Sequence, residues 1–175
     1  YLANHPERWG GGGGCQAPRR WRWDGFDFQV LHPAAGLPYR GNDSSCVISI
    51  HKAGNSLLLA GDISATVENR LMLNGLEPHR VVLVPHPGSS TSSGSPFINA
   101  LQADIAVATT GLGNRFDFPR QAVIERYRNA GATFWSTGSC GGIELLLETG
   151  GEIRARSARR EKQRLWRWPA AASCP

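Results

Sequence analysis

The sequence lacks the patterns that mark several common protein classes. No uninterrupted apolar run approaches the ~18 residues that a membrane-spanning helix needs, and no internal repeat is present. The four cysteines form no Cys-x-x-Cys pair, which argues against a zinc ribbon or a thioredoxin-like motif. The first residue, Tyr1, is not a methionine, and no signal-peptide pattern follows it. We therefore expect the chain to be a piece of a longer protein.

A phosphate-binding loop is also lacking near the N-terminus. Residues 10–14 are five consecutive glycines, but no strand precedes them and no Lys-Ser/Thr follows them. Such a run is typical of a flexible loop, because glycine loses much backbone entropy inside a helix or strand. We predict a flexible segment over residues 1–14, a folded domain over 15–157 and a basic tail over 158–175.

Acidic residues are scarce toward the C-terminus, where the formal charge of +5 is concentrated. Between residues 154 and 167 only Glu161 opposes the basic side chains of Arg154, Arg156, Arg159, Arg160, Lys162, Arg164 and Arg167. A local basic stretch suits contact with a polyanion or a solubilising tail. Arg164 and Arg167 alternate with tryptophans, so they are candidates for phosphate contacts beside stacked bases. The alternative is a solvated terminal segment.

The spacing of the cysteines leaves their state open. A disulfide between Cys15 and Cys46 is compatible with the sequence if the domain lies outside the cytoplasm. Free buried thiols are equally compatible.

What the sequence does contain is the pattern of an α/β fold. With 175 residues and 41% hydrophobic residues, the chain is long enough for one packed domain. Alternation over residues 20–23 and 26–31, separated by Asp24-Gly25, predicts a β-hairpin. Further strands are expected at 45–50, 56–60, 80–84, 104–110, 132–136, 143–148 and 152–156, and helices at 63–73, 96–101 and 119–129. This order predicts an α/β layered fold.

The centre of the chain places polar residues after two buried strands. The apolar runs 57–60 and 81–84 are followed by Asp62 and His86. Binding sites in α/β sheets are built at the carboxyl ends of strands. A carboxylate and an imidazole there are candidate metal ligands or an acid/base pair. Alternatively, Asp62 favours the positive end of the following helix and His86 holds a loop by a hydrogen bond.

Other polar residues flank this pair. Ser89 lies in a Gly-Ser-Ser-Thr loop that could bind a phosphate through N–H groups and hydroxyls, or could be an ordinary polar loop. Asn42 and Ser44 fit turn chemistry, in which such side chains bond their own backbone. A Ser89–His86–Asp62 triad is disfavoured because no Gly-x-Ser-x-Gly turn surrounds Ser89.

Five segments in order resemble a known family. They are residues 42–47 (NDSSCV), 57–63 (LLLAGDI) with Glu68 and Leu71, 84–89 (VPHPGS) with Thr91-Ser92-Ser93, 114–116 (NRF) before Pro119, and the upstream Cys15, 21–26 and 30–33. Together these resemble the C-terminal metallo-β-lactamase-like domain of the competence protein ComEC.

The resemblance implies the C-terminal part of a metallo-β-lactamase-like αββα sandwich. It implies a metal-dependent DNA phosphodiesterase that acts in DNA uptake, with zinc or manganese as cofactor and Asp62 and His86 as catalytic residues and metal ligands. The implied phosphate- and DNA-contacting residues are Asn42, Ser44, Ser89, Asn114, Arg164 and Arg167. The implied partners are DNA and the membrane channel part of the same protein, and the implied location is the periplasmic side of the inner membrane, as a soluble domain.

Three departures from the family pattern fall on its chemistry. The family's His-x-His-x-Asp-His motif is absent, Pro87 replaces the second of two paired histidines, and Phe118 replaces a histidine. A metal centre needs several ligands with donor atoms, so we expect that this chain alone does not hold a hydrolytic metal centre. The alternative function is a catalytically degenerate domain that contacts DNA or the channel. A half-sandwich would also expose an apolar sheet face, which predicts self-association.

Overall fold

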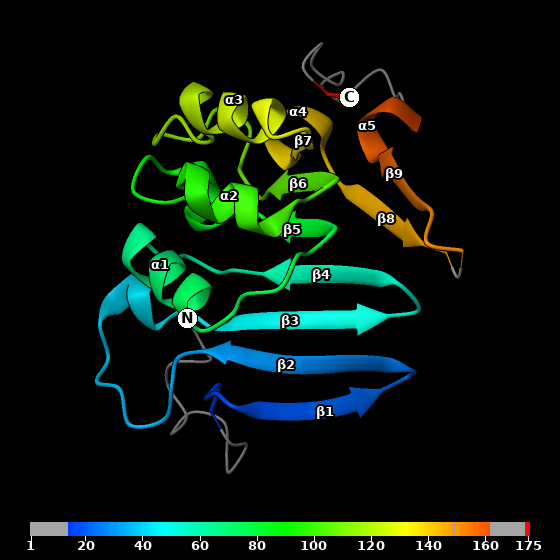
Figure 1. Cartoon of the computed structure of the whole chain (residues 1–175). Helices are drawn as coiled ribbons and strands as arrows, with labels where there is room; N and C mark the ends of the chain where they lie inside the picture. The colour runs from blue at the N-terminus through cyan, green and yellow to red at the C-terminus, as the bar shows by residue number, and fades with distance from the viewer. Residues whose placement is uncertain (1–13, 149, 162–173) are drawn as a thin grey trace.

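A seven-stranded mixed sheet forms the centre of the molecule. The computed structural model describes residues 14–148, 150–161 and 174–175. The strands lie side by side in chain order, from the blue edge to the yellow edge in Figure 1. They are β1 (Arg19–Trp23), β2 (Phe26–His32), β3 (Val47–Lys52), β4 (Asn55–Leu59), β5 (Val81–Leu83), β6 (Ile105–Ala108) and β7 (Thr133–Ser136). Pairing is antiparallel from β1 to β4 and parallel from β4 to β7.

Three helices cover one face of this sheet (Figure 1). They are α1 (Ala65–Leu73), α2 (Ser95–Leu101) and α3 (Gln121–Asn129). Helix α1 begins after Ser64, whose hydroxyl accepts a hydrogen bond from the Thr66 N–H at 3.3 Å, as its sequence predicts. Alternate strand residues such as Val82 and Ala106 join the helices in the main core.

A separate hairpin covers part of the opposite face. Strands β8 (Ile143–Leu147) and β9 (Ile153–Ser157) pair with each other and pack on Val81, Ile105 and Val107. The same apolar row continues across β4, β3 and β2, where Leu57, Ile50 and Phe28 are paired neighbours. Beyond the hairpin these residues line an apolar hollow of about 180 Å³ beside Trp23, whose side chain is 71% exposed.

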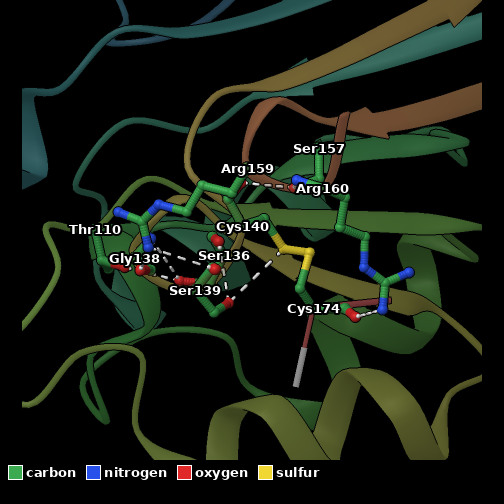
Figure 2. Close-up of a disulfide and its surroundings, with 9 residues drawn as sticks. All are labelled: Thr110, Ser136, Gly138, Ser139, Cys140, Ser157, Arg159, Arg160 and Cys174. Carbon is green, nitrogen blue, oxygen red and sulfur yellow. Dashed lines mark hydrogen bonds between the residues drawn. A yellow bond between two sulfur atoms is a disulfide. The ribbon is translucent and has the colours of Figure 1, made fainter. Parts of the chain in front are cut away.

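Two disulfides connect distant parts of the chain. Cys15 bonds Cys46, and Cys140 at the end of α4 (Thr137–Cys140) bonds Cys174, so no cysteine is free. Figure 2 shows the second bond beside α5 (Ala158–Glu161), where Arg160 donates a hydrogen bond to the Cys174 carbonyl at 2.8 Å. The first pair was one of the two states that the sequence left open, and the second was not predicted. It ties the end of the predicted tail to the folded part.

The expected α/β layered fold is confirmed. Each predicted strand is present, although the last two form their own small sheet instead of closing the main one. The helices predicted from residues 63 and 119 begin later, at Ala65 and Gln121. Two short 3-10 helices, η3 (Gly41–Ser44) and η4 (His86–Gly88), were not predicted. No helix in the described ranges is long and apolar enough to cross a membrane, and the proposed division of the chain at residues 14 and 157 stays a prediction.

Candidate functional site

Four loops meet where β4, β5 and β6 end and β3 begins. We call this surface the loop edge and define it by residues 41–45, 61–64, 86–91 and 114–120. The His86 N–H donates to the Gly61 carbonyl at 2.9 Å, which joins the ends of β4 and β5. The Arg120 N–H donates to the Gly88 carbonyl at 3.0 Å, which joins the third loop. Sheet topology therefore brings together segments that are up to 79 residues apart in the sequence, as the parallel strands predict.

Two glycines allow the loops to approach so closely. Gly61 has a φ of +59°, and a Cβ built on it would lie 2.8 Å from the Ser45 Cβ. Gly88 has a φ of +89°, and its Cβ would lie 2.5 Å from the Pro119 Cβ. Both positions combine a left-handed backbone with a close contact, which only glycine satisfies without strain.

His86 lies at the centre of the loop edge. Its Nε2 is 3.5 Å from the Asn42 amide nitrogen, and its Nδ1 is 3.4 Å from the Thr91 hydroxyl. The ring also meets the edge of Phe118, with 5.7 Å between ring centroids. The backbone of His86 has a φ of +45°, a conformation that non-glycine residues seldom adopt and that is often found at functional positions.

Asp62 lies on the same edge and is exposed to solvent. Its carboxylate makes no hydrogen bond or ion pair with the residues that the structure describes. The N–H of Ser64 just before α1 is instead bound by the Asp43 side chain, with 3.0 Å between N and Oδ1. The helix-terminus role considered for Asp62 is thus filled by Asp43, which the sequence analysis did not single out.

The remaining predicted residues divide into two groups. The hydroxyl of Ser44 accepts the Arg40 N–H at 2.7 Å, and that of Ser89 lies 3.0 Å from the Thr91 hydroxyl. Both serines are buried, so their hydroxyls support local turns. Asn114 closes its loop by donating to the Phe118 carbonyl at 2.7 Å and accepting its N–H at 3.0 Å. Arg164 and Arg167 lie outside the described residues.

The donor atoms of the loop edge do not by themselves fit a zinc or manganese site. Over the described ranges, no group of three or more His, Cys, Asp or Glu side chains is placed to hold a metal ion. Pro87 and Phe118 carry no donor atoms, and the two imidazole nitrogens of His86 face Asn42 and Thr91. A structural or catalytic zinc needs at least three protein ligands.

Comparison with known proteins places this chain in a family. The chain is 35% identical over 160 residues to the competence protein ComA of Neisseria gonorrhoeae, which covers 90% of this chain and 23% of that protein. It is 32% identical over 131 residues to recombination protein 2 of Haemophilus influenzae, covering 75% of this chain and 16% of the relative. The chain belongs to the ComEC family of competence proteins.

A further relative agrees with this membership. ComE operon protein 3 of Bacillus subtilis is 35% identical over 103 residues, covering 57% of this chain and 13% of the relative. No protein-family model matches the chain. This ComEC-family chain spans less than a quarter of the length of these curated relatives.

A buried carboxylate holds the segment that joins the loop edge of this ComEC-family chain to α2. Glu68 of α1 is 1% exposed and accepts backbone hydrogen bonds from Ser93 and from Gly94, the latter at 3.0 Å. Burial raises the pKa of Glu68 above its usual value of 4.5, although these two N–H groups and Arg126 oppose the shift. The signal in the sequence was an acidic residue between Val67 and Leu71, on the apolar side of the predicted helix.

The 114–120 loop also carries residues that the sequence analysis left without a role. Phe116 is 53% exposed and stacks on Phe118, with 5.7 Å between ring centroids. Arg115 and Arg120 lie over these two rings. The sequence Arg-Phe-Asp-Phe-Pro-Arg was a visible signal, because exposed aromatic residues between arginines are typical of binding surfaces.

Proposed function

We propose that this chain supplies a DNA-contacting surface to a ComEC-family DNA-uptake protein and that the loop edge makes the contact. The observation that carries the proposal is that the Asn42 and Thr91 side chains lie against His86, whose ring meets Phe118 on the 114–120 loop. The Arg120 guanidinium lies over the same Phe118 ring. Amide, imidazole and hydroxyl groups donate hydrogen bonds to phosphate oxygens, and arginines add charge-assisted ones. Such contacts position a nucleic acid without reading its sequence.

Carboxylates on the same surface limit the affinity that we expect. Asp62 is exposed, and Asp117 pairs with Arg120 at 3.2 Å. The loop edge is therefore of mixed charge, and it suits moderate, salt-dependent binding instead of tight binding. The proposed contacts of Arg164 and Arg167 with phosphates would add to it.

Binding is tested by fluorescence anisotropy with labelled DNA at low and moderate salt. We expect wild-type protein to bind, Asn42→Ala and Arg120→Ala to bind several-fold more weakly, and Arg128→Ala to bind normally. Arg128 is an exposed arginine in the last turn of α3, at the other end of the helix from the loop edge, so it matches the charge change. Equal losses in Arg120→Ala and Arg128→Ala would argue for a nonspecific charge effect and against the loop edge.

Metal-dependent phosphodiesterase activity is a second candidate. It is favoured by the exposed carboxylate of Asp62, which has no partner among the described residues, and by the imidazole of His86 after neighbouring parallel strands. Zinc or manganese would need further ligands from beyond the described residues, so no catalytic step is assigned here. Cleavage of DNA by the purified chain in Mn²⁺ or Zn²⁺, lost in Asp62→Asn, would support this candidate. Absence of both cleavage and bound metal would leave DNA contact as the function of this chain.

We further propose that the domain is a soluble part of an inner-membrane protein, on the periplasmic side, and that its partners include the membrane channel part of the same protein. The two disulfides support this location, because such bonds persist in oxidising compartments and are rare in the cytosol. Alkylation of thiols at the moment of cell lysis tests it. The proposal expects all four cysteines to be protected until a reductant is added, and extensive labelling without reductant would contradict it.

A further inference from the structure

A serine lies between two histidines at the end of the sheet opposite to the loop edge, where β5 begins. The Ser49 hydroxyl oxygen on β3 is 2.7 Å from Nε2 of His51 and 2.7 Å from Nε2 of His79. The two rings are tilted by 53°, with 5.3 Å between their centroids. Ser49 and His79 are 3% and 1% exposed, and both line a cleft of about 300 Å³. We call Ser49, His51 and His79 the histidine–serine chain.

The hydrogen positions in this chain follow from the bond at its inner end. Nδ1 of His79 is 2.7 Å from the Glu77 carbonyl, which can only accept, so Nδ1 carries a hydrogen. In a neutral His79 ring Nε2 is then an acceptor, and the Ser49 hydroxyl donates to it. Because the hydroxyl hydrogen is used in this bond, Nε2 of His51 donates to the Ser49 oxygen. All three hydrogen bonds therefore point the same way, from His51 toward Glu77.

This direction leaves room for one additional proton. A proton from solvent meets His51 first, because His51 is half-buried and His79 is buried. A protonated His51 still donates from Nε2, so no hydrogen bond changes. His51 can then give its Nε2 proton to the Ser49 oxygen while Ser49 gives its hydroxyl proton to Nε2 of His79. The positive charge moves inward in this way, and no side chain has to move.

A second proton does not fit the same arrangement. Both Nε2 atoms would then donate to the Ser49 oxygen, and the hydroxyl hydrogen would have no acceptor within the chain. The two positively charged rings would also repel each other across the short distance between them. Burial lowers the pKa of His79 below its usual value of 6.5, and the neighbouring His51 adds to this shift while Glu77 opposes it.

Charged side chains near the histidine–serine chain balance in sign. The α1 side of the cleft is formed by Leu71 and Asn74, which are uncharged. The charged neighbours are Arg20 of β1, Asp27 of β2, which pairs with Arg22, the cleft residue Glu77, and Arg80, which pairs with Asp104. Burial and the repulsion between the two rings therefore decide how many protons the chain holds.

We infer that the histidine–serine chain is a pH-sensitive switch between β3 and residues 74–79. With no added proton or with one, the Ser49–His79 hydrogen bond holds this segment to β3. When both rings are charged, the bond is lost and the segment loosens beside the cleft. Histidine pairs are suited to this role because their charge changes at mildly acidic pH. The switch does not depend on the proposed DNA contact.

NMR of ¹⁵N-histidine-labelled protein tests the proton positions. In basic solution we expect the hydrogen on Nδ1 of His79 and on Nε2 of His51. On acidification both rings should respond in each of two steps, separated by more than about one pH unit. In Ser49→Ala each ring should respond only in its own step, whereas Ser49→Thr keeps the hydroxyl and should behave as wild type. A hydrogen on Nε2 of the neutral His79 ring, or shared responses that persist in Ser49→Ala, would overturn the proton relay.

Amide hydrogen exchange tests the conformational part. Below the second step, exchange at Leu76 and His79, corrected for the intrinsic effect of pH, should accelerate at least about five-fold, as expected from the loss of one neutral hydrogen bond. Exchange at Val84, at the loop-edge end of the same strand, should not change. His51→Asn replaces a half-buried ring and should remove the acid step even if Ser49→Ala does not fold. Unchanged exchange in residues 74–79, or equal acceleration at Val84, would overturn the switch.

Discussion

Replacement of Gly88 by alanine should destabilise the loop edge more than a comparable glycine replacement elsewhere. Gly88 has a φ of +89°, and an added Cβ would lie 2.5 Å from the Cβ and 2.9 Å from the Cα of Pro119. The left-handed backbone costs an L-residue about 1–2 kcal/mol. Displacing packed atoms costs a further ~1–3 kcal/mol. We therefore expect Gly88→Ala to lower the free energy of unfolding by roughly 2–5 kcal/mol.

Gly131 provides the matched control. Its φ is +93°, but nothing lies within 4 Å of the position of its Cβ. Gly131→Ala should thus lose only the backbone contribution, about 1–2 kcal/mol. Urea denaturation followed by circular dichroism measures both variants, and equal m-values would show that the unfolded states are comparable. Equal losses in the two variants would refute the close contact between Gly88 and Pro119, and with it the packing that sets the 114–120 loop.

Three further predictions follow from buried groups and from the uncovered sheet face. Glu68→Ala leaves the buried Ser93 N–H and the half-buried Gly94 N–H unpaired, which should cost about 2–6 kcal/mol at roughly 1–3 kcal/mol each. Glu125→Ala on the exposed side of α3 should change the unfolding free energy little. Burial lowers the pKa of His79 below its usual value of 6.5, so the unfolded state binds more protons and stability should fall as the pH drops below about 6.5. This decline should be smaller in His79→Asn, and a pH profile of the variant identical to that of the wild type would contradict the prediction. The apolar hollow beside Trp23 predicts self-association, so sedimentation should show dimers that Trp23→Glu dissociates, and a monomeric wild type at high concentration would count against it.

The sequence predicted the elements that depend on local patterns. Alternation around Asp24-Gly25 identified the first hairpin, and the apolar runs before Asp62 and His86 identified parallel strands. Once those strands were assigned, their carboxyl ends had to lie at one edge of the sheet. The approximate position of the loop edge could therefore be predicted from the sequence.

What was missed depends on contacts between residues far apart in the chain. Glu68 reaches Ser93 across 25 residues and Cys140 reaches Cys174 across 34, and neither distance leaves a periodic signal. The role of Asp43 depends on how β3 lies against β4, which brings it to the start of α1. Such pairs are set by tertiary packing, which hydrophobic periodicity does not encode.

The most direct test of the central claim is a titration of ¹⁵N-labelled protein with a short single-stranded oligonucleotide, followed by NMR. The proposed DNA contact predicts that the largest amide shifts cluster in residues 86–91 and 114–120, with smaller shifts in 41–45 and 61–64. Largest shifts on β1–β3, or no shifts in the described residues, would contradict it.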